Sequence, residues 1–211
     1  MKRLALMLLV GLIALSGAFA AGQGEDDDVL RVAATFGDLG NPFFYTMGQG
    51  VEDAALELDP NAEVTVVSSG YDLNTQTDQM DNFIANNVDI IVLNAADTAG
   101  IAPAVRRAKE AGVIVVAADV NADGGVDATV TSNNFQAGVQ SGEYIVDRLG
   151  GSGNVLIING PPVSAVIDRV DGAMSVFDQN DGITILSDNQ NAGGNREGGL
   201  RVMTDLLTAF D

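Results

Sequence analysis

The chain has 211 residues, enough for one large domain or two small ones, and it contains neither cysteine nor histidine. Within this sequence, that composition excludes disulfides, zinc–thiolate sites and catalysis by Ser-His-Asp or Cys-His groups. The formal net charge of −19 repels nucleic acid and anionic membranes, so we expect neither as a partner of the folded part.

Residues 1–20 have the pattern of an export signal. Lys2 and Arg3 precede an apolar run over 4–15, which is too short to span a bilayer, and Ala18-Phe19-Ala20 is an A-x-A cleavage site. We therefore expect a signal peptide and an exported protein. The acidic, glycine-bearing residues 21–28 are expected to form a flexible leader.

From residue 29 onward, short apolar runs alternate with segments of helical period. The runs are 30–36, 64–67, 90–93, 113–116, 155–158 and 183–186. Most are continuous blocks of valine, isoleucine and leucine, which is typical of strands buried on both faces of a parallel sheet. Strands that alternate with helices predict βαβ units and a doubly wound α/β fold.

The alternation breaks once, after the run at 113–116. A loop over 119–125 leads to a predicted strand at 126–132 that no helix precedes. Such an extra strand is expected where the chain crosses between two sheets. We place the boundary near Ser132-Asn133-Asn134, which gives an N-terminal α/β lobe at 29–132 and a C-terminal α/β lobe at 133–211.

Two local patterns bear on helices and cofactors. Thr98 is expected to cap the helix that contains Pro103 in its first turn. The glycine cluster at 150–153 follows a helix and precedes a strand, the wrong order for a dinucleotide-binding loop. Asp38, in the loop after the first strand, would repel a phosphate. The sequence therefore argues against a nucleotide-dependent enzyme.

Residues that follow parallel strands face one crevice at the carboxyl ends of those strands. Asn41-Pro42-Phe43-Phe44 follows the first run, and its two rings and amide suit a flat apolar face with a polar rim. The polar residues after the other strands include Asn94, Asp119, Asn133, Asn159, Arg169, Asn195 and Arg196. Amides and carboxylates with a few rings indicate a neutral, polyhydroxylated ligand.

Two structural alternatives remain open for these residues. Phe43 and Phe44 would pack inward if the segment simply started a helix, since phenylalanine is mostly buried. Turns favour asparagine and aspartate for backbone reasons, which would explain about half of the polar residues at the strand ends.

The residues from about Leu30 to the end resemble the periplasmic sugar-binding proteins of ABC transporters, in the ribose-binding-like group. The markers, in order, are Asn41-Pro42-Phe43-Phe44, Val92-Leu93-Asn94, Ala111-Gly112-Val113-Ile114-Val115, Asp119, Ser132-Asn133-Asn134 with Ala137-Gly138, Arg169 ahead of Gly172, and Gly199-Leu200 with Leu206-Leu207-Thr208-Ala209. The resemblance implies the periplasmic binding protein type I fold, in which two α/β lobes joined by a hinge close on one sugar and catalyse no reaction.

The expected substrate-binding residues are Asn41, Phe43, Phe44, Asn94, Asp119, Asn133, Arg169 and Asn195. By the resemblance, Arg169 would reach the ligand from the second lobe, and Asn133 would lie at the first hinge crossing. No catalytic residue, cofactor or metal is expected.

Four departures from the family pattern stand out. Val120 and Ile167 replace arginines of ribose binders, and Gly194 falls where a second-lobe aromatic would stack on the sugar. Losing two guanidinium groups and a ring argues against ribose, so a different monosaccharide or a polyol is expected. Family members normally continue beyond this length, so the second lobe is expected to be incomplete, with an uncovered strand edge.

The expected function is capture of a monosaccharide or polyol in the periplasm and delivery to the membrane permease of an ABC transporter, by a monomer. A ligand sensor of the same fold, for chemotaxis or quorum signalling, is the alternative. In either role, binding would shift the population toward a closed form that a membrane partner recognises.

Overall fold

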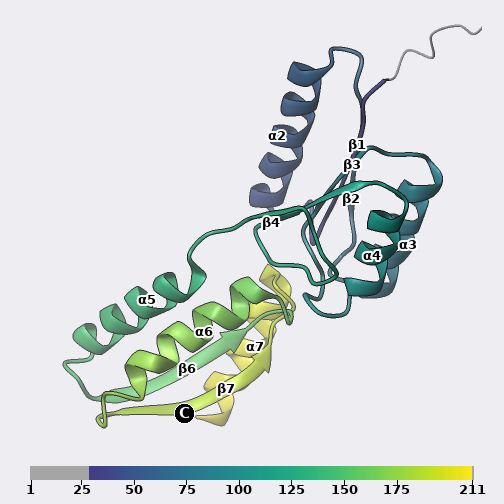
Figure 1. Cartoon of the computed structure of the whole chain (residues 1–211). Coiled ribbons are helices and arrows are strands. Elements are labelled where there is room, and N and C mark those ends of the chain that lie inside the picture. Colours follow the sequence, from purple (N-terminus) through teal and green to yellow (C-terminus); the bar gives the residue numbers. More distant parts are fainter. Residues whose placement is uncertain (1–28, 211) are drawn as a thin grey trace, which may run out of the picture.

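A computed structural model describes residues 29–210 (Figure 1). The signal peptide and leader expected at 1–20 and 21–28 lie outside these residues. The chain forms a five-stranded parallel sheet in the order β2-β1-β3-β4-β5 and a two-stranded parallel sheet, β6-β7. We call the larger sheet with its helices the first lobe and the elements from α5 onward the second lobe. The predicted two-lobed α/β fold is confirmed.

The first lobe comprises β1 (Arg31–Phe36), α2 (Pro42–Leu58), β2 (Glu63–Ser68), α3 (Leu73–Ala85), β3 (Ile90–Leu93), α4 (Ala102–Glu110), β4 (Ile114–Ala118) and β5 (Ala128–Val130). The second lobe comprises α5 (Asn134–Arg148), β6 (Gly153–Asn159), α6 (Ser164–Phe177), β7 (Ile183–Asn191) and α7 (Arg196–Ala209). No helix within residues 29–210 is both long and apolar enough to cross a bilayer.

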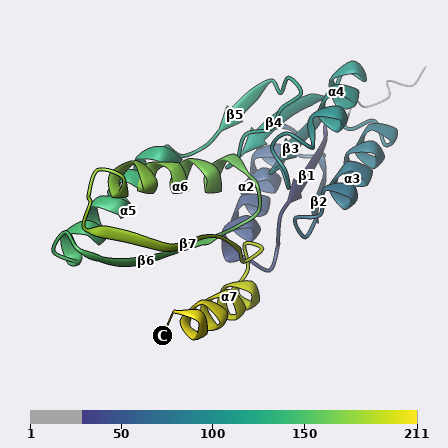
Figure 2. The ribbon, with the colours of Figure 1, turned by 90° about the horizontal axis from the view of Figure 1, so that it is seen from below.

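Helix α2 covers one face of the first sheet, and α3 and α4 cover the other (Figures 1 and 2). Strand β1 packs against helices on both faces of the sheet. Ala33 packs in the cluster that contains Val105 of α4, whereas Ala34 and Phe36 pack in the cluster that contains Phe44 of α2. Burial on both faces explains why β1 has a nearly continuous apolar sequence.

Helix α3 fills the interval between the second and third apolar runs, where the alternation predicts a helix, and its buried face includes the polar side chain of Gln76. Asp72 caps this helix by accepting a hydrogen bond from the Thr75 N–H at 2.6 Å. The strand predicted at 126–132 is shorter and spans Ala128–Val130, where it pairs in parallel with β4 at the edge of the first sheet.

In the second lobe, α5 and α6 lie on one face of β6-β7 and α7 lies on the other (Figure 2). Val202 and Leu206 of α7 are buried against Leu156 and Ile158 of β6. The sheet has two strands where the first lobe has five, which agrees with the expected incomplete lobe.

Two glycines let the backbones of α5 and α6 approach each other closely. A Cβ atom at Gly138 would lie 2.1 Å from the Arg169 carbonyl oxygen, and one at Gly172 would lie 2.2 Å from the Phe135 carbonyl oxygen. No side chain fits at either position without separating the helices. The two glycines therefore fix the position of α6, the helix that carries Arg169.

Replacing Gly138 by alanine should destabilise the chain, because the added methyl group collides with backbone rather than with a movable side chain. We expect a loss of about 1–3 kcal/mol in the free energy of unfolding, the usual range for an overpacked site. The control is Gly50→Ala in α2, where a Cβ would meet nothing within 4 Å. It should gain up to about 1 kcal/mol from helix propensity. Urea denaturation of both variants tests this, and equal stabilities would contradict the proposed contact.

Candidate functional site

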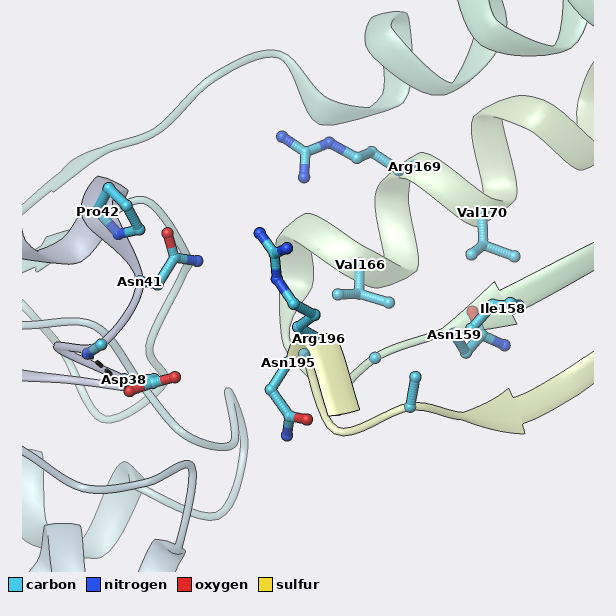
Figure 3. A pocket seen from close by; sticks show the side chains of 14 residues that line it. Asp38, Asn41, Pro42, Ile158, Asn159, Val166, Arg169, Val170, Asn195 and Arg196 are labelled. Atoms are coloured by element: carbon cyan, nitrogen blue, oxygen red, sulfur yellow. Dashed lines mark hydrogen bonds between the residues drawn. The ribbon is translucent and has the colours of Figure 1, made fainter. Parts of the chain in front are cut away.

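Two neighbouring cavities, of about 590 and 290 Å³, lie between the lobes at the carboxyl ends of the strands. The larger is lined by Asp38 and Asn41 from the first lobe and by Asn159, Asn195 and Arg196 from the second (Figure 3). Residues common to both cavities are Asn41, Gly160, Val166, Arg169 and Gly194. The shared wall makes them one cleft, at the position that open α/β sheets use for ligands.

Six of the eight expected binding residues line the smaller cavity: Asn41, Phe43, Phe44, Asn94, Asp119 and Arg169. Asn195 lines the larger cavity. Asn133 lines neither of them.

The Asn94 side chain connects three strand ends beneath the cleft. It is 1% exposed, and its Oδ1 accepts a hydrogen bond from the Gly37 N–H at 3.3 Å. Its Nδ2 donates to the Ala118 carbonyl oxygen at 3.1 Å and to Asp119 Oδ2 at 3.2 Å. With these bonds made, Asn94 mainly positions Asp119 and offers little free hydrogen-bonding capacity to a ligand.

Gln76 supports Asn94 from below, and sequence reasoning missed it. Its Nε2 donates to the Asn94 carbonyl oxygen at 2.9 Å, and its Oε1 accepts from the Ala96 N–H at 2.7 Å. The side chain is fully buried, so both bonds lie away from water. A lone glutamine within a helix has no sequence signal that distinguishes this role from an exposed one.

Asp119 presents a partly buried carboxylate to the smaller cavity. It follows β4 with a left-handed φ of +70°, a region that aspartate and asparagine tolerate better than other side chains. Burial raises the pKa of the Asp119 carboxyl, and the hydrogen bond from Asn94 and the charge of Arg169 oppose that shift. Asp119 and Arg169 face the same cavity from opposite lobes, which places an acceptor and a donor across one ligand.

The two phenylalanines have different roles. Phe44 is 5% exposed and packs against Phe36 and Tyr71, so the inward-packing alternative describes it well. Phe43 is 51% exposed and meets Phe44 edge to face, with ring centroids 5.2 Å apart. Phe43 therefore offers an open ring face at the cavity, while Phe44 supports it.

Three of the predicted binding asparagines cap helices. Asn41 Oδ1 accepts from the Phe43 N–H, Asn133 Oδ1 from the Gln136 N–H and Asn195 Oδ1 from the Gly198 N–H, all at 2.8–3.0 Å. Asn41 and Asn195 also line the cleft, so each can cap a helix and contact a ligand. Asn133 caps α5 and lines neither cavity, so this geometry gives no support to its predicted contact with the ligand.

The first lobe caps a helix of the second. Val163, at the N-cap of α6, provides no side-chain bond, and the Ser164 N–H donates instead to Thr98 Oγ1 at 3.0 Å. Ser164 Oγ accepts from the Asn121 N–H at 2.7 Å. Thr98 was predicted to cap α4, and that prediction is wrong, because α4 begins at Ala102 without a side-chain cap.

Arg169 and Arg196 enter the cleft from the second lobe (Figure 3). Arg169 lies on α6, whose first turn the first lobe holds, and Arg196 begins α7 directly after its cap Asn195. Within residues 29–210, neither guanidinium group lies within 4 Å of a carboxylate. Both groups are therefore available to a ligand. The same residues contain no cluster of metal-ligating side chains.

Tyr71 is a cavity residue that the sequence reasoning did not identify. It lines the smaller cavity from the loop between β2 and α3. A Cβ atom on Gly194 would lie 3.3 Å from the Tyr71 ring. The first lobe therefore places a ring beside Gly194, the position at which the family pattern has a second-lobe aromatic residue. An aromatic residue in a loop after a strand was the available signal.

The sequence matches the family described as the periplasmic binding protein domain over residues 32–211, and the chain belongs to that family. Its members are solute-binding proteins and not enzymes, which confirms the expectation that this chain is no enzyme.

Among its relatives, the ribose import binding protein RbsB of Bacillus subtilis is 33% identical over 171 residues, covering 80% of this chain. The xylitol-binding protein of Mycolicibacterium smegmatis is 28% identical over 211 residues, covering 95% of this chain. The chain spans 54% and 59% of the lengths of these two relatives.

A solved structure with a similar fold is an ABC transporter solute binding protein from Bacillus halodurans with bound myo-inositol. Its TM-score is 0.78 at 26% identity, and the alignment covers 89% of this chain and 66% of the other. The resemblance drawn from the sequence is thereby confirmed at the level of the family and the fold.

Asp119 gives the stability of the chain a specific pH dependence. Its pKa is raised in the folded state, so the folded chain holds this proton more tightly than the unfolded chain does. Relative to Asp119→Asn, the free energy of unfolding of the wild type should fall as the pH rises from below the ordinary aspartate pKa to neutrality. Urea denaturation of both proteins across that range measures the difference. A difference that stays constant with pH would contradict the raised pKa.

Removing both interlobe hydroxyl acceptors, with Thr98→Val and Ser164→Ala, should loosen the contact between the lobes. Each hydrogen bond contributes about 1 kcal/mol, so we expect ligand affinity to fall about tenfold or more. The radius of gyration of the free protein, measured by X-ray scattering, should increase. Thr208→Val with Ser175→Ala is the control, because those hydroxyls bond within single helices. Equal affinity and scattering in both double variants would show that the interlobe bonds are not needed.

Proposed function

We propose that the protein captures a monosaccharide or polyol in the periplasm and delivers it to the membrane permease of an ABC transporter. The observation that carries the proposal is the smaller cavity, into which the first lobe brings Asn41, Phe43 and Asp119 and the second lobe brings Arg169. The relatives named above support it, since they are described as binding ribose, xylitol and myo-inositol.

The charges along the cleft favour a neutral ligand with many hydroxyl groups. Asp38 and Asp119 face it from the first lobe, and Arg169 and Arg196 face it from the second. Carboxylates accept hydrogen bonds from hydroxyl groups and guanidinium groups donate to them, so one polyol satisfies both sides. An anionic ligand would meet the two aspartates, and a cationic ligand the two arginines.

The proposed mechanism is closure around the ligand. Each lobe holds part of the contacts, so only the form with both lobes in place satisfies the whole ligand. The interlobe bonds at Ser164 would hold that form, and a permease would recognise it. In this proposal, residues 29–132 and 133–211 are the two lobes, residues 1–20 direct export, and the protein acts as a monomer. The relatives favour transport over the alternative role as a sensor.

Calorimetric titration with ribose, allose, xylitol and myo-inositol tests the proposal. We expect micromolar or tighter binding of at least one of them, with a sugar or polyol other than ribose bound most tightly. Asp119→Asn should weaken that binding about 10- to 100-fold, because a hydrogen bond to a charged group contributes about 1.5–3 kcal/mol. Asparagine is chosen because it tolerates the left-handed φ of position 119.

Asp123→Asn is the matched control, because Asp123 is an exposed aspartate that lines neither cavity of the cleft. Its affinity should equal that of the wild type. No binding of any of the four compounds would refute the proposed function. Equal affinities of both variants would remove Asp119 from the site.

A further inference from the structure

Tyr71 adopts a backbone conformation that is unusual for its type. Its φ is +59°, directly after Gly70 at +62°. The left-handed region is strained for a residue with a bulky side chain, and such strain persists only where surrounding contacts hold it. The contacts of the Tyr71 ring therefore indicate what the strained turn achieves.

The ring lies between a glycine of each lobe. A Cβ atom on Gly37 of the first lobe would lie 2.3 Å from Tyr71 Cε1, and one on Gly194 of the second lobe would lie 3.3 Å from Cε2. Phe44 meets the same ring edge to face, with centroids 6.2 Å apart. The absence of side chains at the two glycines makes the space that the ring fills.

The same ring separates two hollows. On one side is the smaller cavity, with Asp119 and Arg169. On the other is a hollow of about 400 Å³ lined by Asp38, Asn195 and Arg196. Burial raises the pKa of Tyr71 to about 12, and the charges of Asp119 and Asp38 add to the shift. The phenol is therefore a protonated hydrogen-bond donor at neutral pH.

We propose that Tyr71 is a specificity-determining residue of the cleft: its ring, seated against Gly194, forms the wall of the smaller cavity, and its hydroxyl donates a hydrogen bond to a hydroxyl group of the bound sugar or polyol. The proposal rests on the proposed function. It assigns to one first-lobe side chain both a contact with the ligand and a contact with the second lobe.

The seat of the ring explains why position 194 carries glycine. A Cβ atom there would lie 3.2 Å from Pro161 Cδ of the same lobe and 3.3 Å from Tyr71 Cε2, so a side chain would crowd both. Gly193 next to it has the same φ of +69°, but a Cβ there would meet only the Asn195 side chain, at 3.2 Å. Alanine at 193 and at 194 therefore imposes the same backbone strain, and only alanine at 194 meets Tyr71.

The first test separates the hydroxyl from the ring. Tyr71→Phe keeps the ring in its seat and removes the donor. For whichever of ribose, allose, xylitol and myo-inositol the wild type binds most tightly, we expect the affinity to fall about three- to tenfold, the effect of one neutral hydrogen bond. Thermal unfolding without ligand should remain close to that of the wild type, because the Tyr71 hydroxyl makes no hydrogen bond to another residue within 29–210.

The second test is a double-mutant cycle across the two lobes. In the wild-type background, Gly194→Ala should weaken binding at least about fivefold more than Gly193→Ala, because its methyl group meets the ring. Tyr71→Gly removes the ring and suits the left-handed backbone. In that background the difference in affinity between the two alanine variants should shrink, because only the contact of the methyl group at position 194 with Pro161 of the same lobe remains and the coupling with the ring is lost.

The outcomes are distinct. If the wild type binds and Tyr71→Phe binds equally well, the ligand contact is refuted. If the affinity difference between Gly194→Ala and Gly193→Ala is the same in both backgrounds, the contact between the Tyr71 ring and Gly194 is refuted. If the wild type binds none of the compounds, the proposed function fails and this inference fails with it. Only the first two outcomes refute the role of Tyr71 while leaving the proposed function standing.

Discussion

The buried Asn94 amide is the interaction on which the cleft depends. It joins the ends of β1, β3 and β4 and orients the Asp119 carboxylate by hydrogen bonds that are buried or partly buried. Gln76 in turn holds the backbone on either side of Ala95. A buried polar network of this kind is stable only when its members are satisfied, so the ligand-facing edge of the first lobe is preorganised.

The second lobe reaches that edge through one helix. Helix α6 is capped by Thr98 of the first lobe at its start and lies against the backbone of α5 around Gly172. Arg169 sits between these two fixed points, so its backbone position is set by main-chain contacts and leaves only the side chain to adapt. The same helix thus positions the arginine and joins the lobes.

The order of strands and helices was predictable because buried parallel strands leave continuous apolar runs. The role of Gln76 in α3 was not predictable, because this side chain is buried for its hydrogen bonds and not for its hydrophobicity. The positions of Asn41, Asp119 and Arg169 followed from the rule that strand ends converge. The capping roles of Asn133 and Thr98 did not follow from the sequence, because the residue that caps a helix depends on a geometry that only the folded chain defines. Tyr71 follows a strand and could have been considered on that ground, but its contact with Gly194 crosses between the lobes and only the folded chain shows it.

The position of Tyr71 has an optical consequence. The 211 residues contain no tryptophan and three tyrosines, so tyrosine dominates the intrinsic fluorescence of this chain. Tyr45 and Tyr144 are 57% and 66% exposed, whereas Tyr71 is part of the cleft wall. Light emitted by the unlabelled protein therefore reports from one partly buried position and two solvated ones. Tyr71 is therefore an intrinsic fluorophore in the cleft wall, and no dye needs to be attached.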